Sequence, residues 1–400
     1  MAVSYRFLIV NENYLGHQTV HKLLCEQLAR NADIDFDTIT LDSVHSLRDR
    51  LHRALACLRF VPGQWLQRQN LDWQRFRFQW YVATIARERV LQQLARHHYN
   101  AIHFHSQTAA LRCGDIIRKI PALISTDITN TQASREWNHP LTRWTYLPNR
   151  WMEGYIFKDA ACIASFSEWT RRWMLREHPK LCPDKIVHFP PGADLSAFAQ
   201  IPVQRPVKDK LQILFVGGDF PRKGGFDLLH CFETHFQAHF QDRCELHLVT
   251  SYPLSNLPPG VFVYSDIRPY SAELIERYRQ ADLYVMPTTN EAYGHVFIEA
   301  MASGLPVVAT HINAIPEIIA DGETGILIPP GDTSALKNAL QQLIDDPALR
   351  LRMGEAGRLR AITQFDAHTC YQRYVDALKD ISAPMPHAPP ELSGATYSRR

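Results

Sequence analysis

Short apolar runs alternate with helix-like stretches along this chain, and the alternation occurs twice. Strands that alternate with helices build βαβ units, whose strands pair in a parallel sheet covered by helices. The expected strands of the first half are 5–10, 35–41, 101–105, 122–125, 162–165 and 185–189, and its clearest helices are 21–30, 76–97 and 168–177. The first half therefore predicts a doubly wound α/β domain.

Prolines at 190–191, 202 and 206 mark the best candidate linker, and the pattern restarts after them. The expected strands of the second half are 212–216, 245–250, 261–264, 283–286, 306–310 and 325–328, with helices at 225–236, 271–280, 297–303, 315–320 and 333–345. Because 400 residues exceed the usual size of one core, we predict two Rossmann-like α/β domains that face a cleft, at 1–198 and 199–366. A helix expected at 367–381 is a candidate to pack back on the first domain, and the Pro- and Ser-rich tail at 382–400 predicts disorder.

The cysteines and the apolar runs indicate the compartment. Eight Cys are scattered without a CxxC pair, which fits reduced thiols and neither a disulfide framework nor a structural zinc site. The apolar run at the start is too short for a signal peptide, and no run approaches the ~18 apolar residues of a membrane span. We therefore expect a cytoplasmic protein.

The segment 288–310 carries two carboxylates, Glu291 and Glu299, with Gly294 between them and a buried strand after them. A helix start offers free N–H groups to phosphate, and a carboxylate can accept hydrogen bonds from two sugar hydroxyls. The alternative is structural: a loop Glu, and a first-turn Glu that complements the helix dipole. The spacing of the two residues alone favours the structural alternative.

The segment 215–225, FVGGDFPRKGG, places Gly217 and Gly218 at a strand end, followed by Arg222 and Lys223 before a helix. Adjacent cations at a helix start suit a diphosphate, although a solvated basic turn would look the same. The loop is neither a P-loop nor GxGxxG, so a nicotinamide cofactor gains little support.

Two strand ends of the first half also carry polar side chains. His105 lies where it could touch a sugar hydroxyl or a leaving phosphate, and Asp127 could line the acceptor side. The alternatives are a packed structural His and ordinary turn chemistry for Asp. His103 and His105 lack an evident third ligand, so no metal is expected.

The first half is basic, with 25 Lys and Arg against 18 Asp and Glu in residues 1–198, although the whole chain has a formal net charge of only +2. Residues 46–98 hold ten Arg and three acids, with Trp, Phe and Tyr interleaved. Such a surface suits an anionic bilayer or an anionic acceptor, and peripheral membrane contact is one interpretation. The near-neutral net charge argues against nucleic acid. The alternative is a helical layer with ordinary snorkelling Arg.

Taken together, these segments resemble the GT-B retaining glycosyltransferases of the family 4 type (glycosyl transferases group 1). The resemblance is carried by ADLYVMPTTNEAYGHVFIEAMASGLPVVATHINAIPEIIADGETGILIPPGD, and more weakly by AIHFHSQ, PALISTD, CIASFSEWT and FPPGADLSAF. It implies two Rossmann-like domains, a nucleotide-sugar donor held mainly by the second domain, retention at the anomeric carbon, and no metal or other cofactor.

The resemblance also implies residue roles. The expected catalytic residues are Glu291 at the donor-sugar hydroxyls, Lys223 and Arg222 at the diphosphate, and His105 facing the donor sugar. The expected donor-binding residues are Gly16, Gly217, Gly218, Tyr293, Gly294, His295, Val296 and Glu299, the last on the ribose, and Asp127 belongs to the acceptor side.

Several positions depart from the family pattern. Gly218 stands where the family often has Arg, a charge that Arg222 is placed to supply. Ala292 replaces a common Gly, His295 replaces a common apolar residue, and Asp127 stands where many members carry His. These changes leave the donor and the acceptor open.

The expected function is transfer of a hexosyl unit from a nucleoside-diphosphate sugar to a saccharide or lipid-linked acceptor. Family analogy suggests envelope polysaccharide, exopolysaccharide or glycolipid synthesis, in the cytoplasm or at the inner face of the cell membrane. The alternatives are a GT-B sugar-nucleotide epimerase-type enzyme and a non-catalytic GT-B interaction protein.

Overall fold

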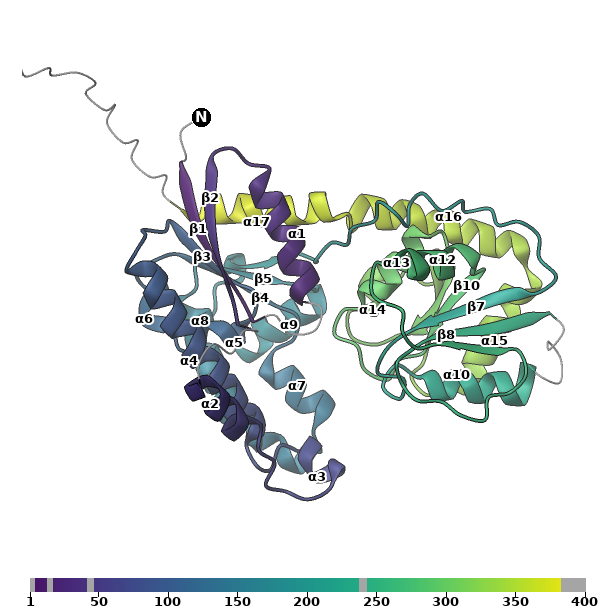
Figure 1. The fold of residues 1–400 in the computed structure, drawn as a ribbon, viewed down its shortest axis with the longest axis horizontal. Coiled ribbons are helices and arrows are strands. Elements are labelled where there is room, and N and C mark those ends of the chain that lie inside the picture. The colour runs from purple at the N-terminus through teal and green to yellow at the C-terminus, as the bar shows by residue number, and fades with distance from the viewer. Residues whose placement is uncertain (1–3, 13–16, 42–46, 237–242, 383–400) are drawn as a thin grey trace, which may run out of the picture.

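The structure, a computed structural model, describes residues 4–12, 17–41, 47–236 and 243–382. These ranges form two α/β units, each built on a six-stranded parallel sheet (Figure 1). The strand orders are β2-β1-β3-β4-β5-β6 in the first unit and β12-β11-β10-β7-β8-β9 in the second. The prediction of two doubly wound parallel sheets is confirmed.

The first unit contains the chain up to the proline-rich segment. Its strands are β1 (Tyr5–Asn11), β2 (Ile34–Thr40), β3 (Ala101–Phe104), β4 (Ala122–Thr126), β5 (Cys162–Ser165) and β6 (Ile186–His188). Its helices are α1 (His17–Ala29), α2 (Leu47–Cys57), α3 (Gln64–Arg68), α4 (Gln74–Leu94), α5 (Gln107–Ala110), α6 (Gly114–Ile117), α7 (Asn130–Trp137), η1 (Pro140–Tyr146), α8 (Leu147–Asp159), α9 (Glu168–Glu177) and η2 (Pro183–Lys185).

The second unit repeats the architecture. Its strands are β7 (Leu211–Val216), β8 (Cys244–Val249), β9 (Val261–Tyr264), β10 (Leu283–Met286), β11 (Val307–Thr310) and β12 (Gly325–Ile328). Its helices are α10 (Gly225–Cys231), η3 (Phe232–Phe236), α12 (Ala272–Gln280), α13 (His295–Ala302), α14 (Ile315–Ile318), α15 (Thr333–Asp345) and α16 (Pro347–Gln364). The central strands β10 and β11 are buried over their whole length, which is why they read as continuous apolar runs.

Helix α16 was not expected from the sequence. It contains Gly354 and Gly357, and glycine inside a helix costs about 1 kcal/mol relative to alanine. Here the glycines permit close packing, because a Cβ on Gly354 would lie 2.2 Å from the carbonyl oxygen of Gly304. Glycines therefore weaken the helical signal of this segment in the sequence, and one of them, Gly354, lets α16 approach the end of α13.

The chain returns to the first unit through α17 (Ala367–Asp380), which packs beside α1 (Figure 1). Tyr371 and Tyr374 are buried in the same apolar cluster as Phe7 and Ile9 of β1. Of the tail expected at 382–400, residues 383–400 lie outside the described part of the chain.

The outgoing and returning connections between the two units touch each other. Ala193 N donates to the Phe365 carbonyl at 3.0 Å, and Ala367 N donates to the Ala193 carbonyl at 3.1 Å. A Cβ on Gly192 would lie 2.7 Å from the Cα of Ala367, so only glycine allows this approach. The second unit is thus inserted into the first through one paired crossing. Leu195 and Phe198, just beyond it, already pack in the core of the second unit.

Within the described ranges, none of the helices combines the length and the apolar composition that a bilayer crossing requires.

Candidate active site

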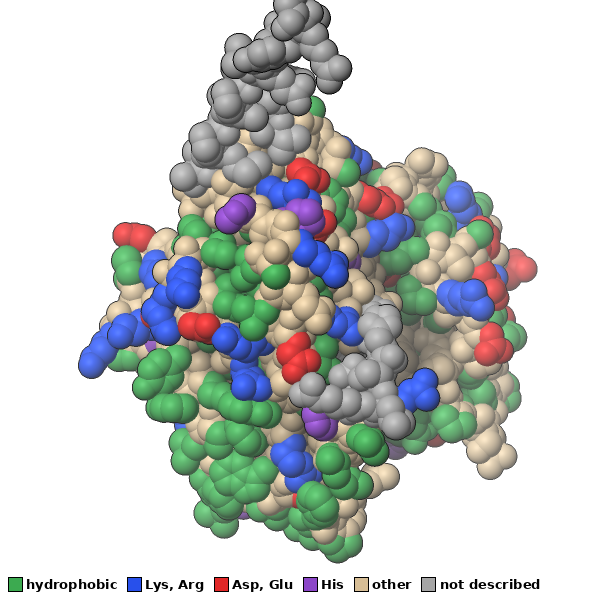
Figure 2. Space-filling view, turned by 60° about the vertical axis from the view of Figure 1, so that its left-hand side comes forward, with side chains coloured by type: hydrophobic (Ala, Val, Ile, Leu, Met, Phe, Trp, Pro, Cys, Tyr) green, Lys and Arg blue, Asp and Glu red, His purple; other side chains and the backbone are tan. Residues whose placement is uncertain are grey.

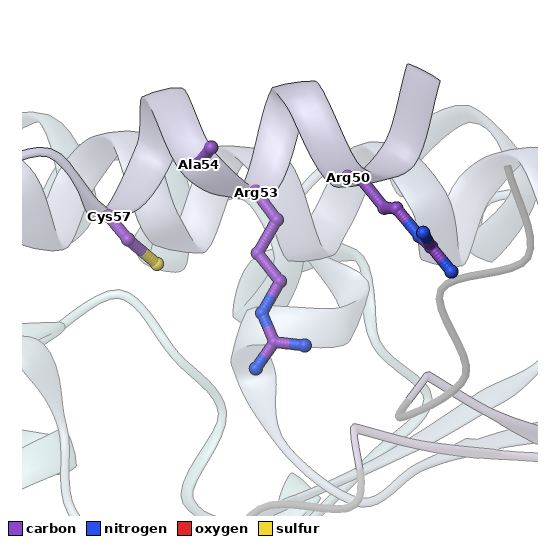
Figure 3. Close-up of a pocket in the computed structure, with 4 residues that line it drawn as sticks. All are labelled: Arg50, Arg53, Ala54 and Cys57. Atoms are coloured by element: carbon purple, nitrogen blue, oxygen red, sulfur yellow. The ribbon is translucent and has the colours of Figure 1, made fainter. Parts of the chain in front are cut away.

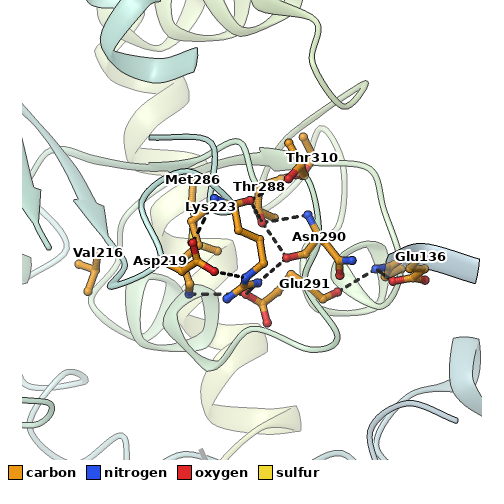
Figure 4. A network of polar contacts seen from close by, with 12 residues as sticks. Glu136, Val216, Asp219, Lys223, Met286, Thr288, Asn290, Glu291 and Thr310 are labelled. Carbon is orange, nitrogen blue, oxygen red and sulfur yellow. Dashed lines mark hydrogen bonds and ion pairs between the residues drawn. The ribbon is translucent and has the colours of Figure 1, made fainter. Parts of the chain in front are cut away.

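Two loops meet at the carboxyl edge of the second sheet, where open α/β sheets bind ligands. One follows β7 and the other follows β10, and these strands are neighbours in the sheet. The backbone N–H of Thr289 donates to the carbonyl of Arg222 at 2.9 Å, and the hydroxyl of Thr288 lies 3.1 Å from the same carbonyl. Thr310, at the end of β11, supports the second loop by donating to the Thr288 carbonyl at 2.5 Å (Figure 4).

The charged side chains of these loops converge on one carboxylate. Glu291 Oε2 lies 3.5 Å from Lys223 Nζ and 3.6 Å from Arg222 Nη1. Arg222 also donates through Nε to Asp219 at 2.9 Å, so two carboxylates hold its guanidinium (Figure 4). The structure therefore brings together three of the four residues expected to be catalytic.

Lys223 is held in place by the shape of the loop. A Cβ on Gly217 would lie 2.5 Å from Lys223 Cδ, so Gly217 leaves the space that the lysine stem occupies. The side chain of Lys223 is only 15% exposed, and its ammonium group lies beside Glu291. Gly218 is not constrained in this way, because the nearest atom to its Cβ position is Ser251 Oγ at 3.7 Å.

Glu299 is buried on the inner side of α13. The hydroxyl of Tyr278 donates to its Oε2 at 3.1 Å. Burial raises the pKa of Glu299 to about 7, although hydrogen bonds from Tyr278 and Tyr270 and the charge of Lys223 act against the rise. The sequence analysis did not single out these tyrosines, and Tyr278 has the spacing of an ordinary core residue on α12.

The start of α13 combines a special backbone with an unpaired ring nitrogen. Gly294 is the N-cap with φ of 101°, and His295 opens the helix. Burial lowers the pKa of His295 to about 4, and its Nε2 has no hydrogen-bond partner among the described residues. His295 is thus a neutral imidazole with capacity for a ligand hydroxyl. Val296, the next residue, is half-buried.

The side chain of Tyr293 contacts both the start of α13 and the first unit, because its ring lies 5.4 Å from that of His295. Its ring also lies 6.4 Å from that of Phe166 in the first unit, and it lines a hollow together with Glu317 and Phe365, near the paired crossing. The side chain therefore packs between the two units, while its backbone stays in the Glu291 loop.

We predict that Gly294→Ala destabilises the protein more than Gly322→Ala. Both glycines have positive φ (101° and 75°), where an alanine costs about 1–3 kcal/mol of backbone strain. A Cβ at position 294 would also lie 2.7 Å from the buried ring of Phe297, whereas position 322 has nothing within 4 Å. Urea unfolding of both variants measures the difference, and equal losses would contradict the assigned role of the Phe297 contact.

His105 follows β3 in the first unit and is buried. Its Nε2 lies 3.2 Å from His21 Nδ1, and its ring is 4.5 Å from that of His103, which contacts Ser125 Oγ at 2.7 Å. Burial, followed by the neighbouring His103 and His21, lowers the pKa of His105 well below its usual value. His105 is therefore neutral, with Nδ1 lacking a partner among the described residues. Gly16 lies outside those residues.

The strand ends of the first unit contain a charged residue that the sequence analysis did not single out. Glu12 follows β1 and accepts a hydrogen bond from Ser106 at 2.6 Å, with His17 Nδ1 3.3 Å from its other oxygen. Burial raises the pKa of Glu12, and the charge of Asp127 contributes to the rise. Asp127 thus faces a second acid at the first-unit strand ends. Its place in the sequence could have indicated it, because Glu12 comes directly after a buried strand, where site residues of parallel sheets lie.

Second-unit side chains reach across to the first unit. Asn313 Nδ2 donates at 3.1 Å both to Glu136 Oε2 on α7 and to the backbone carbonyl of Glu291. The carboxylate of Glu317 accepts the N–H groups of Glu168 and Trp169 at 2.7 and 2.6 Å. A carboxylate from one unit therefore caps helix α9 of the other. These contacts set the Glu291 loop opposite the first-unit strand ends.

One group of side chains has the composition of a metal site. Ligand atoms of Glu153, Glu177 and His178 all lie within 4.8 Å of one another. Both carboxylates already accept hydrogen bonds at the start of α7, Glu153 from Asn130 (backbone N–H 3.0 Å) and Glu177 from Thr129 (3.1 Å). Burial raises the pKa of Glu153 to about 8. Helix capping with a retained proton accounts for this group.

Residues 256–360 match the family model described as glycosyl transferases group 1. This range contains β10, α13 and both glutamates of the site. The alpha-maltose-1-phosphate synthase of Mycolicibacterium smegmatis is 29% identical over 279 residues, which are 62% of this chain and 70% of that protein.

Solved structures are similar over nearly the whole chain. Sucrose-phosphate synthase from Thermosynechococcus elongatus has a TM-score of 0.70 at 20% identity, covering 94% of this chain and 99% of that one. Anabaena HepE, crystallised in complex with UDP-glucose, has a TM-score of 0.63 at 15% identity, covering 94% of this chain and 100% of that one. At these identities the likeness establishes the fold.

Proposed function

We propose, from the premise that this chain is a group 1 glycosyltransferase with the GT-B fold, that it transfers a hexosyl unit with retention from a nucleoside-diphosphate sugar. The observation that carries the proposal is the meeting of Glu291 with Lys223 and Arg222 beside the start of α13. A diphosphate needs cations and free N–H groups, and a sugar needs a carboxylate, and this edge of the sheet offers all three.

The chemistry follows from the charges. Lys223, Arg222 and the N-terminus of α13 stabilise the negative charge that grows on the departing diphosphate, which is electrostatic catalysis. Glu291 accepts hydrogen bonds from sugar hydroxyls and thereby orients the anomeric carbon. The acceptor hydroxyl attacks from the face that the diphosphate leaves, and a phosphate oxygen takes its proton. This route uses neither a metal nor a covalent protein nucleophile.

Glu299 is proposed to hold the ribose hydroxyls, and this role makes donor binding dependent on pH. Hydroxyls donate most strongly to an ionised carboxylate, whereas burial keeps Glu299 largely protonated below its pKa of about 7. At a pH between the usual pKa of glutamate and about 7, Glu299 holds a proton in the folded protein but not in the unfolded chain. The contribution of Glu299 to folding stability therefore falls as the pH rises through this range. Donor binding must release the same proton.

We therefore expect the affinity for UDP-glucose to rise by up to about tenfold per pH unit from about pH 5.5 and to level off above about pH 7. Calorimetric titration in two buffers of different ionisation enthalpy measures both the affinity and the released proton. The ligand for this titration is UDP-glucose and not UDP, because the diphosphate of UDP-glucose does not itself titrate in this pH range. Glu299→Gln should flatten the profile, and an unchanged profile in that variant would assign the proton elsewhere.

The acceptor is proposed to enter from the first unit, where Glu12, His17 and Asp127 gather at the strand ends. Carboxylates there suit the hydroxyls of a saccharide or of a lipid-linked sugar. Envelope polysaccharide, exopolysaccharide or glycolipid synthesis remains the proposed process, on analogy of fold. The proposed location is the cytoplasm, with action at the inner face of the cell membrane.

Donor screening tests the function directly. Nucleoside diphosphate release is measured for a panel of nucleotide sugars, starting with UDP-glucose, with and without crude lipid extract or oligosaccharide. Release that depends on an acceptor supports transfer. Sugar isomerisation without an acceptor supports the epimerase-type alternative, and absence of donor binding in a thermal-shift assay supports a non-catalytic protein.

A further inference from the structure

Helix α8 carries an apolar stripe on its solvent side. Trp144 of η1 and Leu147, Trp151 and Tyr155 of α8 follow one another at helical spacing, and they are 48, 53, 67 and 54% exposed. The opposite side of α8 is already used, because Met152, Ile156 and Phe157 are buried in the first-unit core. The stripe of four residues, here the α8 stripe, therefore leaves about half or more of each side chain exposed to solvent within the described chain.

The α8 stripe continues into a row of aromatic rings. The ring of Trp144 lies 5.4 Å from that of Trp73, which is 6.5 Å from Phe76, and Phe76 is 5.9 Å from Trp80. Trp80 is again 42% exposed, and the guanidinium of Arg112 lies 4.6 Å from its centroid. Apolar residues thus run without a break from α8 across η1 to α4.

The surroundings of the α8 stripe are basic. Arg143 belongs to η1 and Lys158 to α8, whereas Arg150 of α8 has a buried Nε and its charge acts against the burial-driven rise in the pKa of Glu177. The two acids of α8 do not offset them at the surface, because Glu153 is fully buried and Asp159 is paired with Arg118 at 2.8 Å. A partner that is both apolar and anionic therefore suits this face.

Helix α2 shows the same combination on the same unit. Leu51 and Leu55 are each 58% exposed, and Arg50 and Arg53 extend to one side of the helix around a shallow hollow (Figure 3). Figure 2 shows apolar side chains interspersed with Lys and Arg over the part of the first unit built from α2, α3 and α4. Mixed apolar and basic surface is thus a property of the unit and extends beyond one helix.

The density of arginine in the sequence does not by itself locate this surface. Arg77 donates to the backbone carbonyls of Asp72 and Leu58 at 2.7 and 2.5 Å, and Arg87 pairs with Asp115. Several arginines of 46–98 therefore serve the fold. The outward-facing aromatic residues of η1 and α8 lie beyond that segment.

We infer that the α8 stripe and its basic flanks rest on an anionic lipid bilayer. Trp and Tyr favour the bilayer interface because their rings are apolar with one polar group, and Leu inserts deeper. Lys and Arg beside them are attracted to anionic headgroups. The biological purpose of this binding rests on the proposed function, because it would bring the first unit to a lipid-linked acceptor. The membrane binding itself does not depend on the donor.

Vesicle sedimentation of the full chain tests the inference. With vesicles of phosphatidylcholine containing about 30% phosphatidylglycerol, we expect binding that falls sharply in about 0.5 M NaCl and is weak without the anionic lipid. The double variant Leu147→Glu/Trp151→Glu should lower the partition coefficient by about tenfold or more, since it exchanges two interfacial anchors for like charges.

The control is Leu359→Glu/Ile362→Glu on α16 of the second unit, where the residues are 67 and 44% exposed and outside the α8 stripe. This variant adds the same charges and should bind like the wild type. No binding by the wild-type protein, equal binding by the α8 variant, or an equal loss in the control would overturn the inference. Binding to native membranes that is lost after protease treatment would point to a protein partner and would also overturn it.

The two proposals can fail independently. The α8 variant should keep its thermal unfolding midpoint and its affinity for UDP-glucose, because its residues lie outside the Glu291 site. Vesicle binding without any donor binding would reject the proposed function and leave the membrane surface intact. Donor binding with acceptor-dependent release of nucleoside diphosphate, but without vesicle binding, would support the proposed function and reject the membrane surface.

Discussion

Lys223→Met should lower kcat for sugar transfer by about 10²–10³-fold, the loss seen when one preorganised charge or donor is removed from a growing anion. Methionine keeps the stem that lies along Gly217 and removes only the ammonium group 3.5 Å from Glu291. The ground-state affinity for the donor should change less, because Arg222 and the start of α13 remain. Nucleoside diphosphate release at saturating donor measures the effect.

The matched control for this variant is Lys180→Met, which removes an exposed lysine from the first unit. Its kcat should stay within about twofold of the wild-type value, as expected for a surface change away from the site. A Lys223→Met enzyme with comparable activity would show that Arg222 or the helix start carries the diphosphate charge.

Glu291→Ala should lower kcat/KM by about 10²-fold or more, since it removes the acceptor for sugar hydroxyls and leaves two cations without their shared carboxylate. The loss should be specific to the sugar. Affinity for UDP-glucose should fall towards that for UDP, while affinity for UDP itself should hold or rise as Lys223 and Arg222 become free for phosphate. Calorimetric titration with UDP-glucose and with UDP separates the affinity for the sugar from the affinity for the nucleotide.

Glu291→Gln is the informative companion, because an amide retains one acceptor oxygen and should keep part of the sugar affinity. Glu323→Ala, an exposed glutamate of the same unit, is the control for charge alone. Equal loss of UDP and UDP-glucose affinity in Glu291→Ala would mean that Glu291 organises the diphosphate site and does not read the sugar.

The sequence predicted the parts of the site that depend on strand ends. Parallel strands bring their carboxyl ends to one edge of a sheet, which allows residues that follow β7 and β10 to meet, and Glu291 does lie beside Lys223 and Arg222. The sequence does not predict the direction in which each side chain of such a loop points. Tyr293 is close to Glu291 in sequence but packs on Phe166 of the other unit, because a turn distributes neighbouring side chains to different sides.

The unpredicted features are contacts between distant segments. Glu317 caps α9 from 149 residues away, and Tyr278 contacts Glu299 from a helix that reads as ordinary core. Helix α16 was missed because its glycines have low helix propensity, and their value appears only once Gly304 is seen against Gly354. Such pairings depend on tertiary geometry, which no local pattern specifies.

The paired crossing at Ala193 and Phe365–Ala367 has a mechanical consequence. An inserted unit held by two separate connectors would resist rotation by stretching one of them, whereas connectors bonded side by side act as one pivot. Rotation about such a pivot changes a few backbone dihedrals near the axis and moves the far side of the cleft most, as in hinge closure. Such a rotation would also have to break the two hydrogen bonds by which Glu317 of the second unit caps α9 of the first.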